Sequence, residues 1–144
     1  MKIQRFEDLE AWQIARELTN QIYTITKKES ICRDFGFVDQ IRRAAISIMN
    51  NIAEGFERGT NKDFAKYIFI ARGSAGEVRS MLYVALDQDY LTGETFKQCH
   101  ELCIRCSQLC WGLIKHLKKH SNWKTKVLIT IMTLVGPLLS LPRG

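Results

Sequence analysis

The sequence has very little proline. Only Pro137 and Pro142 are present among 144 residues, and both lie near the C-terminus. Proline is the residue that most strongly interrupts a helix, so long helices can form throughout the preceding chain. This scarcity favours an all-helical protein.

Two further absences bear on location. The opening stretch, MKIQRFEDLEAW, turns acidic and amphipathic at once and lacks the basic-then-apolar order of a secretory leader. The longest apolar run, residues 127–141, is interrupted by Gly136 and Pro137, and it is shorter than the roughly 20 residues that a membrane-spanning helix needs. We therefore expect a cytoplasmic protein that is not embedded in a membrane. We expect residues 1–120 to form one bundle and residues 121–144 to form an apolar tail, either disordered or docked on a partner.

The sequence also lacks the usual constellations of catalysis and metal binding. It has no serine elbow and no glycine-rich phosphate loop, and its three histidines all occur from residue 100 onward. Four of the five cysteines are spaced along one helical face, at Cys99, Cys103, Cys106 and Cys110. Such a row covers roughly 16 Å and cannot converge on one zinc ion, whose bonds to sulfur are about 2.3 Å long. We expect these cysteines to pack in the core, and we expect no enzyme activity, catalytic residue, metal or cofactor.

Four apolar stripes recur in steps of three and four residues, which is the helical period. They predict helices over residues 7–28, 35–56, 60–86 and 94–119, with a loop at residues 29–34. Joined by short loops, such helices predict an all-α, antiparallel up-and-down four-helix bundle. The stripes consist of Ala11, Ala15, Leu18, Ile22 and Ile25; of Val38, Ile41, Ala45, Ile48 and Ile52; of Phe64, Ile68, Ala71, Ala75, Val78, Leu82 and Ala85; and of Phe96, Cys99, Cys103, Cys106, Cys110, Leu113 and Leu117.

The helix through residues 40–59 is the one around which the others are expected to pack. Beside its apolar stripe runs a polar stripe in which Glu54 and Arg58, like Asp39 and Arg43, have the spacing of helical ion pairs. Gly55 and Gly59 predict its end.

The third helix is expected to begin after Thr60, which has the character of an N-cap with Asp63 three residues on. Gly73 and Gly76 lie inside this helix, where each costs roughly 1 kcal/mol relative to alanine. We expect the segment Gly73–Gly76 to be a tight crossing point with another helix, with a kink as the alternative.

The net charge of +6 is unevenly distributed. Residues 1–112 contain equal numbers of basic and acidic residues, and the excess lies in Lys115, Lys118, Lys119, Lys124, Lys126 and Arg143. One interpretation is contact with nucleic acid; the alternative is a basic helix end that complements the helix dipole.

Phosphate contacts require exposed cations. The predicted nucleic-acid-binding residues are Arg42, Arg43, Arg58, Lys62, Lys66, Arg72, Arg79, Lys115, Lys118 and Lys119. Tyr67 and Tyr83 are the expected stacking residues. The alternative for each cation is a solvated face balanced by acids.

Three stretches carry a family resemblance: FEDLEAWQIARELTNQIY, DQIRRAAISIMNNIAEGFERG and DFAKYIFIARGSAGEVRSMLYVALDQDYL. Together they resemble the bacterial four-helix-bundle family of proteins encoded in intervening sequences of 23S ribosomal RNA genes, related to the accessory variability determinant protein of diversity-generating retroelements. The resemblance implies a homopentameric barrel with nucleic-acid affinity. For the retroelement relative it also implies partnership with a reverse transcriptase. It provides no catalytic residues.

The leading hypothesis is thus a non-enzymatic, homo-oligomeric bundle that binds RNA or DNA without sequence specificity. The alternative is a structural or protein-interaction module, such as a reverse-transcriptase accessory subunit.

Overall fold

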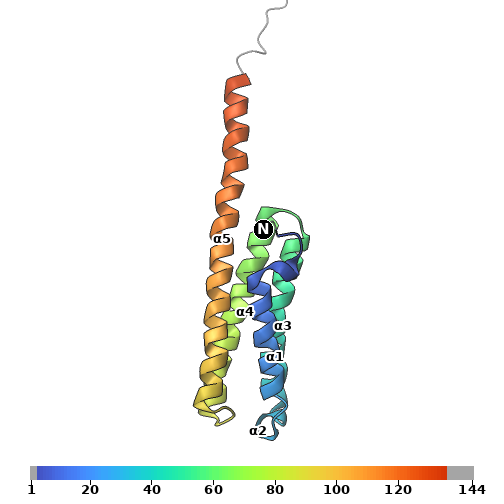
Figure 1. Ribbon diagram of the computed structural model, residues 1–144, viewed down its shortest axis with the longest axis vertical. Coiled ribbons are helices and arrows are strands. Elements are labelled where there is room, and N and C mark those ends of the chain that lie inside the picture. The colour runs from blue at the N-terminus through green and yellow to red at the C-terminus, as the bar shows by residue number, and fades with distance from the viewer. Residues whose placement is uncertain (1–2, 136–144) are drawn as a thin grey trace, which may run out of the picture.

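The structure is a computed structural model that describes the backbone of residues 3–135 and the side chains of residues 3–120. This part of the chain is all-helical (Figure 1). That part contains no strand. A short 3-10 helix precedes five α-helices, and the predicted fold class is confirmed at this level. The elements are η1 (Phe6–Asp8), α1 (Glu10–Ile25), α2 (Glu29–Cys32), α3 (Phe35–Glu57), α4 (Asn61–Asp87) and α5 (Gly93–Val135).

The four long helices surround one apolar core. α1 packs on α3 and α5, α3 packs on α4, and α4 packs on α5. The predicted stripes face this core: all their members are buried except Val38, Phe64, Phe96 and Leu113, which are partly buried against it. Near the middle of α5, Ile114 is fully buried in the core, whereas the stripe predicted Leu113 at this position.

The corner between α3 and α4 is built by Thr60 and two glycines. Thr60 Oγ1 accepts a hydrogen bond from the Asp63 amide at 3.1 Å and donates one to Asp63 Oδ2 at 2.8 Å, so the predicted N-cap is confirmed. Gly59, with φ of +75°, turns the chain just after α3, a conformation that glycine adopts without strain.

Gly55 does not end α3, contrary to expectation, but lies inside it and is buried. A Cβ atom on Gly55 would lie 2.7 Å from Cβ of Tyr67 and 3.1 Å from Cδ2 of Phe64. The missing side chain therefore allows α3 and α4 to approach each other.

The prediction that Gly73 and Gly76 allow another helix of the chain to approach closely is wrong. A Cβ atom on Gly73 or Gly76 would meet nothing within 4 Å. Between them, Ser74 and Ala75 are buried, and the Ser74 hydroxyl hydrogen-bonds that of Ser47 in α3 at 2.9 Å. The glycines thus face away from the helices of their own chain.

Three predicted helix boundaries differ from the structure. α1 begins at Glu10 after η1 and ends at Ile25, inside the predicted range of residues 7–28. Residues 29–32 form α2 where a loop was expected, because four residues are too few for a periodic signal. α5 continues to Val135 instead of ending near residue 119, and Figure 1 shows it projecting beyond the other helices.

The C-terminal part of the chain is described only in part. The expected division at residue 120 stays a prediction, and residues 136–144 of the expected tail lie outside the described residues. In the part described, no helix combines the length and apolar character needed to span a membrane.

Candidate nucleic-acid interface

Cations from α4 and α5 meet on one surface of the bundle. Lys62, Lys66 and Lys118 line a hollow of about 540 Å³ together with Asn61, Ala65, Phe69, Ile70 and Leu117. None of these lining residues is acidic. The hollow therefore has an apolar floor and a cationic rim.

Two half-exposed aromatic rings extend this surface along the α4–α5 seam. Phe69 is 42% exposed and Trp111 is 40% exposed, and their ring centroids are 6.3 Å apart. The Lys118 ammonium lies 4.9 Å from the Phe69 centroid, and the Arg72 guanidinium carbon lies 4.8 Å from the Trp111 centroid. Each cation is within cation–π range of its ring.

Hydrogen bonding and helical spacing complete the surface. Arg72 Nε donates to Ser107 Oγ at 3.3 Å, which fixes the guanidinium beside Trp111. Lys115 follows Trp111 by one turn of α5, and Lys119 follows Lys115 by another; both are exposed. We call Lys62, Lys66, Arg72, Lys115, Lys118, Lys119, Phe69 and Trp111 the basic–aromatic surface.

Two of the other predicted binding residues, Arg42 and Arg43, contact residues of their own chain. Arg42 Nε donates to Thr26 Oγ1 at 2.8 Å, and its guanidinium carbon lies 4.6 Å from the Tyr23 ring, so it ties α3 to the end of α1. Arg43 pairs with Asp39 at 3.0 Å. Arg79 is exposed on α4, two turns after Arg72.

Arg58 belongs to a cluster at the α3–α4 corner. It donates to Glu54 and to the Tyr67 hydroxyl, both at 2.9 Å. The hydrogen bond from Arg58, followed by one from Tyr67, lowers the pKa of the Glu54 carboxyl, and the bond to Glu54 raises the pKa of Arg58. This geometry gives the polar stripe of α3 a role in joining two helices. That these four arginines bind nucleic acid stays a prediction.

Sequence reasoning missed the two aromatic residues of the surface. Tyr67, expected to stack on bases, contacts Arg58, and Tyr83 packs edge-on against Phe96. The signal for Phe69 and Trp111 was present: each is a large apolar residue directly beside a residue of the buried stripe, Ile68 and Cys110.

The cysteine row is buried, as predicted. Cys99, Cys103, Cys106 and Cys110 are each at most 1% exposed. Burial raises the pKa of Cys99 to about 11 and that of Cys103 to about 12, while a hydrogen bond with Cys110, together with burial, raises the pKa of Cys106. These three thiols stay protonated at neutral pH and supply no thiolate nucleophile. Across the described residues, no group of three or more His, Cys, Asp and Glu side chains is placed to hold a metal ion.

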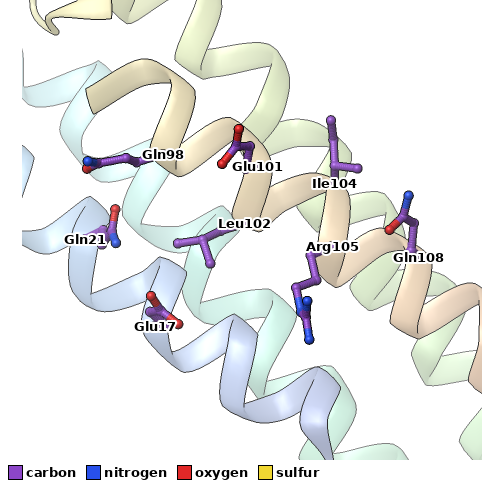
Figure 2. Close-up of a pocket in the computed structure, with 8 residues that line it drawn as sticks. All are labelled: Glu17, Gln21, Gln98, Glu101, Leu102, Ile104, Arg105 and Gln108. Atoms are coloured by element: carbon purple, nitrogen blue, oxygen red, sulfur yellow. The ribbon is translucent and has the colours of Figure 1, made fainter. Parts of the chain in front are cut away.

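A second hollow, of about 690 Å³, lies between α1 and α5 (Figure 2). Its charged lining residues are Glu17, Glu101 and Arg105, and Arg105 forms an ion pair with Glu10. Gln21 of α1 and Gln98 of α5 lie near each other across it. Two carboxylates against one paired guanidinium make this groove a poor site for phosphate.

Fold and surface together define a small, all-helical bundle protein with a cationic, aromatic-bearing face. The chain belongs to the 23S rRNA-intervening sequence protein family, whose sequence model matches residues 7–112. The predicted family is therefore confirmed, while the link to the retroelement accessory protein stays a prediction.

Among solved structures with a similar fold is the crystal structure, at 1.70 Å resolution, of a protein of unknown function from the S23 ribosomal protein family of Bacteroides thetaiotaomicron VPI-5482. The two chains are 24% identical with a TM-score of 0.67, and the alignment covers 73% of this chain and 98% of that one. None of the curated proteins matches the sequence. Neither of the two family names denotes an enzyme.

Proposed function

We propose that this protein is a non-enzymatic, homo-oligomeric helical bundle that binds RNA or DNA through the basic–aromatic surface, without sequence specificity. The observation that carries the proposal is the convergence of Lys62, Lys66 and Lys118 around a hollow whose lining residues include no acid. Family membership supports it, because the family is named for its position within 23S rRNA genes.

The chemistry of the surface suits a phosphate backbone with bases beside it. Lysine and arginine side chains gain affinity for nucleic acid by releasing the counterions that surround phosphates. Exposed aromatic rings add stacking on bases, which is tolerant of sequence because every base has a π-face. Phe69 and Trp111 lie between these cations at about 40% exposure, so both kinds of contact are available on one surface.

The finer architecture that we propose is an antiparallel up-and-down four-helix arrangement assembled as a ring of five copies. Packing of each long helix on the next along the chain, with α1 and α5 closing the circle, supports the antiparallel order. The five-fold ring is what the family resemblance implies.

A salt-dependent titration tests the binding. Labelled single-stranded RNA and duplex DNA are titrated with the protein at two salt concentrations, and the logarithm of affinity is compared with that of salt. We expect binding to both probes, with a slope of about −0.7 to −0.9 per phosphate contact. The double variant Lys62→Gln/Lys118→Gln should reduce the magnitude of the slope by about 2.

The matched control is Lys27→Gln/Lys28→Gln. Both lysines are exposed between α1 and α2, and their removal changes the net charge equally. If the control weakened binding as much as Lys62→Gln/Lys118→Gln, the loss of affinity would be due to the lower net charge and not to the basic–aromatic surface. Absence of binding at low salt would refute the proposal and favour a protein-interaction module.

A further inference from the structure

The hollow between α4 and α5 has room for a single nucleotide. Its volume of about 540 Å³ lies within the range of about 300–1,000 Å³ that is usual for ligand pockets. Ala65 and Leu117 are buried at its apolar floor, while Phe69 and Ile70 are half-exposed beside them. A nucleobase, which is planar and has two π-faces, fits such a floor.

Positive groups surround this floor from two helices. Lys62 and Lys66 come from α4 and Lys118 comes from α5, so lysines flank the hollow on both sides. Within a nucleic-acid strand, each base lies between two phosphates. Lysines on opposite sides of the hollow can therefore bind the phosphates before and after one base. α4 begins at Asn61, which also lines the hollow, so the positive end of the helix dipole lies at the same site.

The seam between α4 and α5 continues from the hollow to a second stacking position. Lys62 and Arg72 are ten residues apart on α4, or roughly 15 Å along the helix axis. The Arg72 guanidinium lies beside the Trp111 ring, at 4.8 Å from its centroid, and Ser107 accepts its hydrogen bond. Bases stack on aromatic rings and on arginine guanidinium planes alike. The seam thus offers stacking to a short stretch of strand.

A duplex can use only the cations of this surface. Its bases are paired and stacked on one another, so neither the apolar floor nor the half-exposed rings gain a partner. Electrostatics alone would favour the duplex, which carries about twice the phosphate charge of one strand per unit length. Each base that stacks on an aromatic side chain adds about tenfold or more in affinity, and only an unpaired strand gains it. Stacking therefore decides the preference.

We propose that the hollow holds one unstacked base of single-stranded RNA or DNA, with Phe69 against the base and the three lysines on the flanking phosphates. The inference rests on the proposed nucleic-acid binding and adds that the surface selects unpaired strands over duplexes. Charge complementarity identifies the occupant, because the lining combines apolar side chains with lysines and contains no acid. The amide of Asn61 both donates and accepts hydrogen bonds, so it suits the edge of any base.

Two matched probes test the inference on the full chain. An unstructured RNA strand, alone and annealed to its complement, is titrated at physiological salt, and we expect the single strand to bind about tenfold more tightly. Phe69→Ala removes the ring and Ala65→Met fills the hollow; each should weaken single-strand binding about tenfold and duplex binding less than about twofold. Neither substitution removes a charge, so the dependence of affinity on salt should stay unchanged.

The matched control is Phe35→Ala, with the helicity of every variant checked by circular dichroism. Phe35 is 77% exposed and begins α3 at the end of the bundle near α2, whereas the hollow lies at the start of α4 (Figure 1). This control should leave both affinities unchanged.

The outcomes separate this inference from the proposed function. If neither probe binds at low salt, the proposed function fails and the inference fails with it. If both probes bind with equal affinity, or if Phe69→Ala weakens both equally, the inference alone is overturned. A preference for the single strand that persists in both Phe69→Ala and Ala65→Met would overturn it as well.

Discussion

The substitution Gly55→Ala tests the packing of α3 against α4 directly. The added Cβ would lie 2.7 Å from Cβ of Tyr67 and 3.3 Å from the Phe64 carbonyl oxygen. Carbon atoms in contact prefer about 3.5–4.0 Å, so the helices would have to separate locally by roughly 1 Å. Neither contacted atom is the end of a flexible side chain, and the backbone itself must therefore move.

Two opposing effects set the magnitude. Overpacking of a tight core site costs about 1–3 kcal/mol, and the upper end applies here because backbone must shift. Replacing a glycine inside a helix by alanine returns about 1 kcal/mol through helix propensity. We expect the free energy of unfolding to fall by about 2 kcal/mol, equivalent to a decrease in Tm of roughly 6–8 °C for a chain of this size.

Urea denaturation followed by circular dichroism, at equal protein concentrations, measures the change. The matched control is Gly112→Ala in α5, where the added Cβ would meet nothing within 4 Å. The control should gain up to about 1 kcal/mol, because only the propensity effect operates there. If Gly55→Ala stabilised the protein as Gly112→Ala does, the close approach of α3 and α4 at Gly55 would be refuted.

Three further predictions concern the cap and the thiols. Thr60→Ala removes the acceptor for the Asp63 amide and should lower the free energy of unfolding, measured by urea denaturation, by about 1 kcal/mol. Thr60→Ser keeps a hydroxyl acceptor and should retain most of the native stability. Equal destabilisation by the two substitutions would exclude a capping role. In the folded protein, iodoacetamide at pH 8 should modify Cys32, which is partly exposed, and spare the four buried cysteines in mass spectrometry. Because the folded pKa values of Cys99 and Cys103 are raised to about 11 and 12, the folded chain holds protons that the unfolded chain releases above about pH 9. Stability should therefore be complete below that pH and decline toward pH 12, and a Cys99→Ala/Cys103→Ala variant should lose less over that interval.

The core of the fold could be predicted from the sequence because burial is periodic. Ile48, Val78 and Cys106 recur with their neighbours in steps of three and four, and each is fully buried. The start of α4 was equally readable, since Thr60 and Asp63 form a local motif that needs no tertiary contact.

The sequence does not predict which side of a helix another helix approaches, and the close contact at Gly55 and the aromatic surface both depend on this. Gly55 and Gly73 have the same intrinsic preferences, yet one lies against Tyr67 and the other in open space. A single sequence contains no information on that difference until the helices are placed around the core. Phe69 and Trp111 illustrate the same limit, because they become one surface only when α4 and α5 pack together.

The length of α5 bears on the dipole interpretation of the basic residues late in the chain. A helix dipole stabilises cations only within about the last turn, and α5 has no basic residue in its last turn. Lys115, Lys118 and Lys119 lie well inside α5, because no glycine or proline interrupts the chain between Gly112 and Gly136. Lys62 lies in the first turn of α4, where the dipole disfavours positive charge, and Lys66 lies one turn further on. The dipole therefore does not explain the position of these lysines, and the meeting of Lys62, Lys66 and Lys118 around one hollow supports the proposed contact with nucleic acid.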